Sequence, residues 1–137
     1  MAVSVVKQYS VFLTNEPGAL SQFASLLARE KISIIATAQG VRYDASILRL
    51  AVRYEDELSH ILTQAGFTSI KTDAICIEAA DHLGLVRDIG HVLGEQKINI
   101  TSIYGAVTAD GKSRWILTVT DLTKALNLLE SSGLFQE

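Results

Sequence analysis

Two short turns carry residue types that could hold a small anion. They are Asn15-Glu16-Pro17-Gly18-Ala19-Leu20 and Asp81-His82-Leu83-Gly84-Leu85-Val86. Each turn leads into an amphipathic segment, and N–H groups at the start of a helix lack internal partners and attract a carboxylate. Gly18 and Gly84 permit close backbone approach. The two turns are therefore the places where we expect a small anion to bind.

A purely structural interpretation of the same residues stays open. Asx residues ahead of a helix commonly act as N-caps, which stabilise the helix by about 1 kcal/mol without any ligand. Pro17 suits a first helical turn because of its fixed φ. Asn99 is unusual in a strand by propensity, and it offers a ligand both a donor and an acceptor.

The two turns belong to an internal repeat. Their glycines lie 66 residues apart, and the apolar positions that follow recur in step. The matched positions are Leu20, Phe23, Leu26, Leu27, Ile32 and Ile34 in the first copy and Val86, Ile89, Val92, Leu93, Ile98 and Ile100 in the second. A repeat of this length is one small folded unit. We therefore predict two domains, residues 1–72 and 73–137.

Hydrophobic periodicity gives each copy the order strand, helix, strand, strand, helix, strand. We expect helices over Ala19–Lys31 and Leu85–Lys97, a strand over Ile32–Gln39 with a loop over Gly40–Ala45, and a hairpin turn at Asp110-Gly111. Asp121 is predicted to cap the last helix, which leaves only Leu134–Glu137 for the final strand. With right-handed crossovers this order predicts an α+β fold. It consists of two ferredoxin-like βαββαβ repeats, with antiparallel sheets side by side and helices on one face.

The repeated motif resembles that of the ACT domain, a small amino-acid-sensing module. That family's signature is a strand ending in Asp/Asn-x-Pro-Gly-x-Leu, a helix, and a second strand of the Ile-Asn-Ile type. The two turns are followed by Ile32-Ser33-Ile34 and Ile98-Asn99-Ile100. Leu83 and Ser33 depart from the pattern, and the resemblance covers essentially the whole chain.

The resemblance implies that an amino acid lies between a first-turn loop and the second strand of a neighbouring domain. Carried onto this sequence, the ligand-binding residues are Asn15, Gly18, Ala19, Leu20, Ser33, Ile34, Asp81, Gly84, Leu85, Val86, Asn99 and Ile100. Asp81, or Asn15 through its carbonyl oxygen, can accept hydrogen bonds from the ligand's ammonium group. Ala19 and Leu85 are expected to line the part that holds the ligand's side chain.

Composition excludes several other classes of function. The net charge is −3 with 20% charged residues and no basic stripe, which disfavours nucleic acid as a partner. No apolar run approaches a membrane span, and the single Cys76 fits a reducing, cytoplasmic compartment. His82 and His91 are not spaced as metal ligands. The sequence shows no nucleophile–base pair and no phosphate-binding loop, so we expect neither catalysis nor a cofactor.

These observations predict a non-catalytic regulatory protein that binds a free amino acid or a similar small carboxylate. We expect a homodimer, because Ser10, Phe12, Cys76, Ile103 and Ile116 are assigned to a partly apolar sheet face away from the helices. A regulated enzyme is a possible partner. The alternative is a ligand-free interaction or dimerisation subunit that controls a partner enzyme or transporter.

Overall fold

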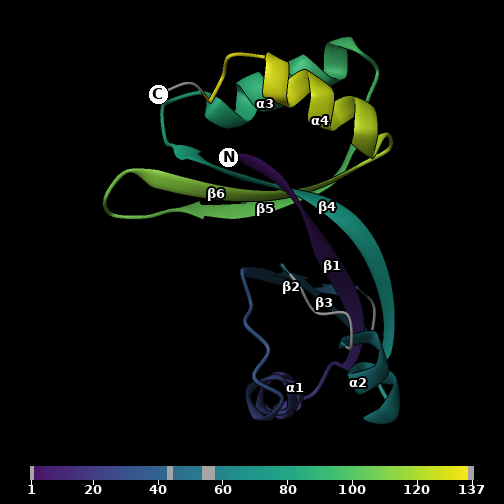
Figure 1. Ribbon diagram of the computed structural model, residues 1–137. Helices are drawn as coiled ribbons and strands as arrows, with labels where there is room; N and C mark the ends of the chain where they lie inside the picture. Colours follow the sequence, from purple (N-terminus) through teal and green to yellow (C-terminus); the bar gives the residue numbers. More distant parts are fainter. Residues whose placement is uncertain (1, 43–44, 54–57, 136–137) are drawn as a thin grey trace. The chain divides into compact units, whose positions relative to one another are not determined.

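The computed structural model describes residues 2–42, 45–53 and 58–135 (Figure 1). Its elements follow the predicted order twice. In the first copy these are β1 (Val3–Thr14), α1 (Ala19–Arg29), β2 (Ala36–Arg42), β3 (Ala45–Val52) and α2 (Leu58–Gln64). In the second copy they are β4 (Thr68–Ala80), α3 (Leu85–Glu95), β5 (Ile100–Val107), β6 (Lys112–Val119) and α4 (Leu122–Ser131).

The six strands form an antiparallel sheet in the order β2-β3-β1-β4-β6-β5. The strand order is the same in both repeats, because β1, β2 and β3 correspond to β4, β5 and β6, and β3 and β6 each lie between the other two strands of their repeat. The α+β fold with two ferredoxin-like repeats is therefore confirmed. The two compact units are residues 7–72 (the first-repeat unit) and residues 1–6 with 73–137 (the second-repeat unit).

The first-repeat unit is built as its periodicity predicts. Strand residues with a period of two face helix residues with a period of three to four, so α1 and α2 cover one face of the strands. The core consists of Tyr9, Val11, Leu13, Phe23, Leu26, Leu27, Leu48, Leu50, Val52, Leu58 and Leu62. Phe67 packs edge-on against Phe23, with ring centroids 5.1 Å apart.

The second-repeat unit obtains its fourth strand from the other end of the chain. Val3 is 4% exposed and packs with Ile75, Ile77 and the apolar side of α3, and the Glu78 amide donates to the Ala2 carbonyl at 2.7 Å. Leu134, by contrast, lies in a turn that packs against the same core.

The predicted final strand over Leu134–Glu137 is thus wrong for residues 134 and 135, and residues 136–137 lie outside the described part of the chain. The position beside β4 is filled by the chain's own beginning, and a sheet position can hold only one strand. The predicted division of the sequence into two domains, residues 1–72 and 73–137, remains a prediction.

A β-bulge in β5 changes which residues face the helices. The pairing of β5 with β6 shifts between Ile100 and Ser102, so the side-chain alternation slips by one residue. Ile103 then pairs with Leu117, a core residue under the helices. The predicted position of Ile103 on the other face is therefore wrong.

Two further residues of that predicted surface, Cys76 and Ile116, are fully buried. Phe12 remains 40% exposed. The apolar surface that the sequence assigned to a dimer contact is thus smaller than expected.

Several helix and strand boundaries differ from those predicted from the sequence. Both long helices end two residues earlier than predicted, at Arg29 and Glu95. Lys31 and Lys97 follow them with φ of 58° and 61°, in the left-handed region. The predicted loop over Gly40–Ala45 is wrong at both ends, because β2 continues to Arg42 and β3 begins at Ala45. The strand predicted to begin at Ile32 begins at Ala36.

Candidate functional site

Glycine forms the N-cap of both long helices. Gly18 and Gly84 have φ of 87° and 89°, a left-handed conformation that other L-residues rarely adopt. Neither helix receives a side-chain cap. Asn15 and Asp81 therefore do not act as N-caps, so the structural interpretation is wrong as far as capping is concerned, and a role in forming the turns stays open. In α4, the side chain of Asp121 does cap, because it accepts a hydrogen bond from the Lys124 amide at 3.1 Å.

The first turn of each long helix offers amides to a ligand. The Ala19 and Leu85 amides each bond back to the preceding turn, at 3.2 and 3.1 Å. Within the described residues, the next two amides of each helix donate to no acceptor in the chain; they belong to Leu20, Ser21, Val86 and Arg87. Such a pair of amides can bind one carboxylate.

Asp81 is fixed through its backbone and keeps its side chain exposed. Its amide donates to the Gly111 carbonyl at 2.7 Å, which ties the turn before α3 to the tip of the β5–β6 hairpin. The Asp81 carboxylate accepts no hydrogen bond from any described residue. The turn before α3 is therefore held in place by its backbone and carries a carboxylate that has no partner among the described residues.

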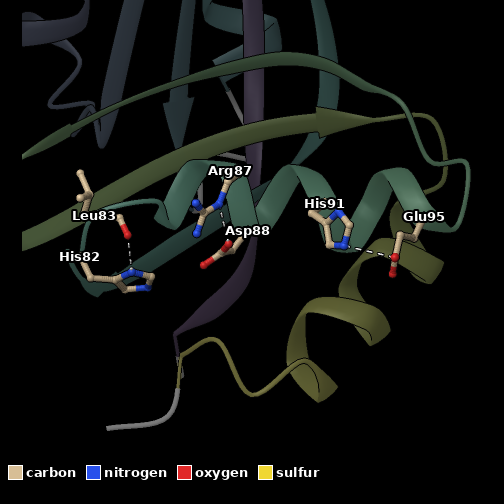
Figure 2. Close-up of polar contacts among 6 residues, drawn as sticks. All are labelled: His82, Leu83, Arg87, Asp88, His91 and Glu95. Atoms are coloured by element: carbon tan, nitrogen blue, oxygen red, sulfur yellow. Dashed lines mark hydrogen bonds and ion pairs between the residues drawn. The ribbon is translucent and has the colours of Figure 1, made fainter.

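Charged side chains follow α3 outward from this turn (Figure 2). A Cβ on Gly84 would lie 2.8 Å from an Arg87 guanidinium nitrogen, so Arg87 folds back over the N-cap. Its Nε also donates to Asp88 at 3.1 Å, and His91 Nε2 lies 3.1 Å from Glu95 Oε1 (Figure 2). Among the residues that the structure describes, no three His, Cys, Asp or Glu side chains gather as a metal would require.

The apolar residues of the turns divide into exposed and buried ones. Leu83 is fully exposed, and Leu20 and Val86 are 46% and 41% exposed. Ala19 is half-buried. Leu85 is only 2% exposed and belongs to the core of the second-repeat unit, so its backbone is the only part that a ligand at the turn could reach.

The predicted strand residues lie at the far end of each long helix from the turns. Asn99 and Ile100 come just after the end of α3, and Ser33 and Ile34 just after the end of α1. The eleven residues of α3 span about 16 Å. One unit therefore brings Asp81, Gly84 and Val86 together but holds Asn99 far from them, too far for one free amino acid to touch both.

Asn99 is held by its backbone at the start of β5. Its amide donates to Thr120 Oγ1 at 3.1 Å, and its carbonyl accepts from the Thr120 amide at 3.0 Å. Its side chain is exposed, as is that of Ser33, while Ile34 is 42% exposed and Ile100 is half-buried.

Sequence reasoning missed a cluster of hydroxyl groups next to Asn99. Thr118 Oγ1 lies 2.7 Å from Thr101 Oγ1 and 2.6 Å from Ser102 Oγ. Alignment of the two repeats would have drawn attention to these residues, because their counterparts in the first repeat are apolar. No local feature of the sequence indicates the β-bulge that places Thr101 and Ser102 opposite Thr118.

Comparison with known proteins identifies the family. A family model described as an ACT domain pair matches residues 4–131. The chain belongs to the family of ACT domain pairs. No curated protein sequence matches this chain.

Solved structures share the fold of this ACT domain pair. Protein BT0572 from Bacteroides thetaiotaomicron is similar with a TM-score of 0.85 at 23% identity, over 96% of this chain and 91% of that one. The ligand-free regulatory subunit of aspartate kinase from Thermus thermophilus is similar with a TM-score of 0.68 at 15% identity, over 95% of each chain. The corresponding subunit from Thermus flavus has a TM-score of 0.64 at 16% identity, over 96% of this chain and 97% of that one.

Proposed function

We propose that this ACT domain pair is a non-catalytic regulatory protein that binds a free amino acid or a similar small carboxylate. The observation that carries the proposal is the turn geometry present in both repeats. In each, a left-handed glycine opens a helix whose next two amides donate to no described residue. Family membership supports a sensing role for this geometry.

In the proposed complex the ligand's carboxylate binds the Val86 and Arg87 amides, where the partial positive charge of the helix start favours it. Its ammonium group binds the exposed carboxylate of Asp81. The first repeat offers the Leu20 and Ser21 amides with Asn15, which is an uncharged and therefore weaker acceptor.

The strand half of the site must come from a second domain, because one unit separates its own turn from its own strand by the length of a helix. We propose that Asn99 or Ser33 of that domain completes the contact. A homodimer would supply such a domain, and sedimentation showing only a 14.9 kDa species at micromolar concentration would contradict it.

A regulated enzyme is the partner that we propose. Regulatory subunits of aspartate kinase share the fold, which supports control of an enzyme by a small-molecule effector.

In the described residues no helix is long and apolar enough to cross a membrane. We propose a cytoplasmic location, on the basis of the lone Cys76.

A thermal-shift panel of the twenty amino acids tests the proposed binding. A ligand that binds only the folded state raises the unfolding midpoint, and the rise grows with ligand concentration. We expect a selective rise for one amino acid or a chemically related few. If none of the twenty amino acids raises the unfolding midpoint, the alternative of a ligand-free interaction subunit is favoured. The fully exposed Leu83 would then be the residue proposed to contact the partner protein.

Asp81→Ala separates binding from folding. The Asp81 carboxylate has no partner among the described residues, so we expect the free energy of unfolding to change by no more than about 0.5 kcal/mol. Loss of a hydrogen bond between charged groups should weaken ligand binding about tenfold or more, as measured by calorimetry.

The matched control is Asp121→Ala. This change removes a helix cap and should cost about 1 kcal/mol of stability while ligand affinity stays the same. Equal affinity of the Asp81→Ala variant and the unchanged protein would place the ammonium group elsewhere.

A further inference from the structure

The second repeat carries three hydroxyl groups in mutual contact at the start of β5. Thr118 Oγ1 lies between Thr101 Oγ1 and Ser102 Oγ, at 2.7 and 2.6 Å. The β-bulge of β5 sets Thr101 and Ser102 opposite this one residue of β6, which is the pattern that a bulge produces. We call these three residues the hydroxyl trio.

The first repeat has the same backbone arrangement without the hydroxyl groups. Ala36 pairs with Ala51 as Ser102 pairs with Thr118, and the Ile35 amide donates to the Ala51 carbonyl at 2.8 Å. Ile35, Ala36 and Ala51 therefore occupy the places of Thr101, Ser102 and Thr118. The backbone alone does not require hydroxyl groups at these positions.

The central residue of the hydroxyl trio is buried, and the two outer residues are more exposed to solvent. Thr118 is 7% exposed, Ser102 is half-buried and Thr101 is exposed. Thr118 alternates with the core residue Leu117, so its side chain lies on the face of the sheet away from the helices. Thr120, which comes directly after the end of β6, holds the backbone of Asn99.

A count of hydrogen-bonding groups indicates what the trio can bind. Each hydroxyl has one proton and two acceptor positions. The two bonds inside the trio use two of the three protons and two of the six acceptor positions. One proton and four acceptor positions remain, so the trio has far more capacity to accept hydrogen bonds than to donate them.

We propose that the hydroxyl trio makes the strand side of the second repeat specific for an amino acid whose side chain donates hydrogen bonds. That class comprises side chains with hydroxyl, amide or ammonium groups. The equivalent strand side of the first repeat offers no side-chain acceptor at these positions, which are occupied by Ile35, Ala36 and Ala51. This inference rests on the proposed amino-acid binding and assigns the selectivity to particular residues.

The test is calorimetry on the full chain with two sets of probes. L-lysine, L-threonine, L-asparagine and L-glutamine carry donors, and L-leucine, L-isoleucine and L-valine do not. We expect at least one probe of the first set to bind. Thr118→Val keeps the shape of the side chain and removes the central hydroxyl, so it should weaken binding of that probe about five- to tenfold.

Thr37→Val is the matched control. Thr37 also donates from a strand, to the Arg49 carbonyl at 2.9 Å, but it belongs to the first repeat. Its change should leave the Kd of the donor-bearing probe unaltered. If Thr118→Val does not fold, Ser102→Ala removes a half-buried hydroxyl and should show the same weakening.

Unchanged affinity in Thr118→Val, or in Ser102→Ala where that variant replaces it, would overturn the inference. A wild-type preference for the aliphatic probes would overturn it as well while leaving amino-acid binding intact. Absence of any binding by the wild-type chain would instead contradict the proposed function itself, before any variant is made.

Discussion

At the scale of single residues, the two turns show how a backbone conformation prepares a site. Gly18 and Gly84 adopt nearly the same positive φ at equivalent positions of the two repeats. This conformation places the preceding Asn15 and Asp81 outside the helix, where they cannot cap it. The result is a pair of helix starts that receive no side-chain cap.

Asp110, at the tip of the hairpin that holds Asp81, gives a prediction on pH. Hydrogen bonding from the Thr108 hydroxyl is the largest cause that lowers the pKa of Asp110 below its ordinary value; desolvation opposes it, and lesser effects of Lys112 lower the pKa further. The deprotonated form is thus favoured by folding. Its contribution to stability is present above the unfolded-state pKa of about 3.9 and is lost as the pH falls through the lower folded-state pKa.

Thr108→Val should therefore raise the pKa of Asp110 toward the ordinary value, which carboxyl-carbon NMR titration would measure. Thr63→Val is the control, because the Thr63 hydroxyl donates to the Ser59 carbonyl within α2, which belongs to the first-repeat unit. An unaltered Asp110 pKa in Thr108→Val would show that the hydroxyl is not the main cause.

At the scale of elements, the long helices end in a repeated motif. The Ile32 and Ile98 amides bond to the Leu27 and Leu93 carbonyls at 2.9 and 3.0 Å, which is the Schellman arrangement. The position before each isoleucine is left-handed and usually glycine, but here it is lysine. Each lysine thus carries a conformational cost of about 1–2 kcal/mol that glycine would avoid.

Lys97→Gly should stabilise the protein by about 0.5–1 kcal/mol in a urea titration, because the relieved strain exceeds the added entropy of the unfolded chain. Lys124→Gly, inside α4, makes the same chemical change in an ordinary helical conformation and should destabilise by a similar amount. A loss of stability in both variants would contradict the argument from φ.

At the scale of the whole molecule, the boundary between the two compact units does not coincide with the boundary between the two sequence repeats. The compact unit formed by the second repeat includes residues 1–6, so β1 and β4 each contribute to both units. Removal of the first residues should therefore damage the half of the protein that lies furthest from them in sequence.

Val3→Ala tests this at one position. Val3 is 4% exposed in the core of the second-repeat unit, so we expect a loss of about 1.5–3 kcal/mol in the free energy of unfolding. Val5→Ala, two residues along the same strand and 44% exposed, should cost less than about 0.5 kcal/mol. Similar losses in both variants would mean that the N-terminal strand is not part of that core.

The sequence by itself determined the features that depend on near neighbours. Apolar periods of two and of three to four residues gave the order of the elements, and the spacing of Gly18 and Gly84 gave the repeat and the helix starts. The Asp121 cap was predicted for the same reason, since it needs only the next three residues. The candidate turns were also found, because a turn and a glycine are local.

The tertiary structure decided the features that depend on distant pairing. Val3, rather than Leu134, lies beside β4, because the choice between two strands for one sheet position involves opposite ends of the chain. The bulge reversed the face of Ile103 and brought Thr101 and Ser102 to Thr118, because register is set by the partner strand. The separation of Asn99 from Asp81 likewise appears only when the helix between them is laid along the sheet.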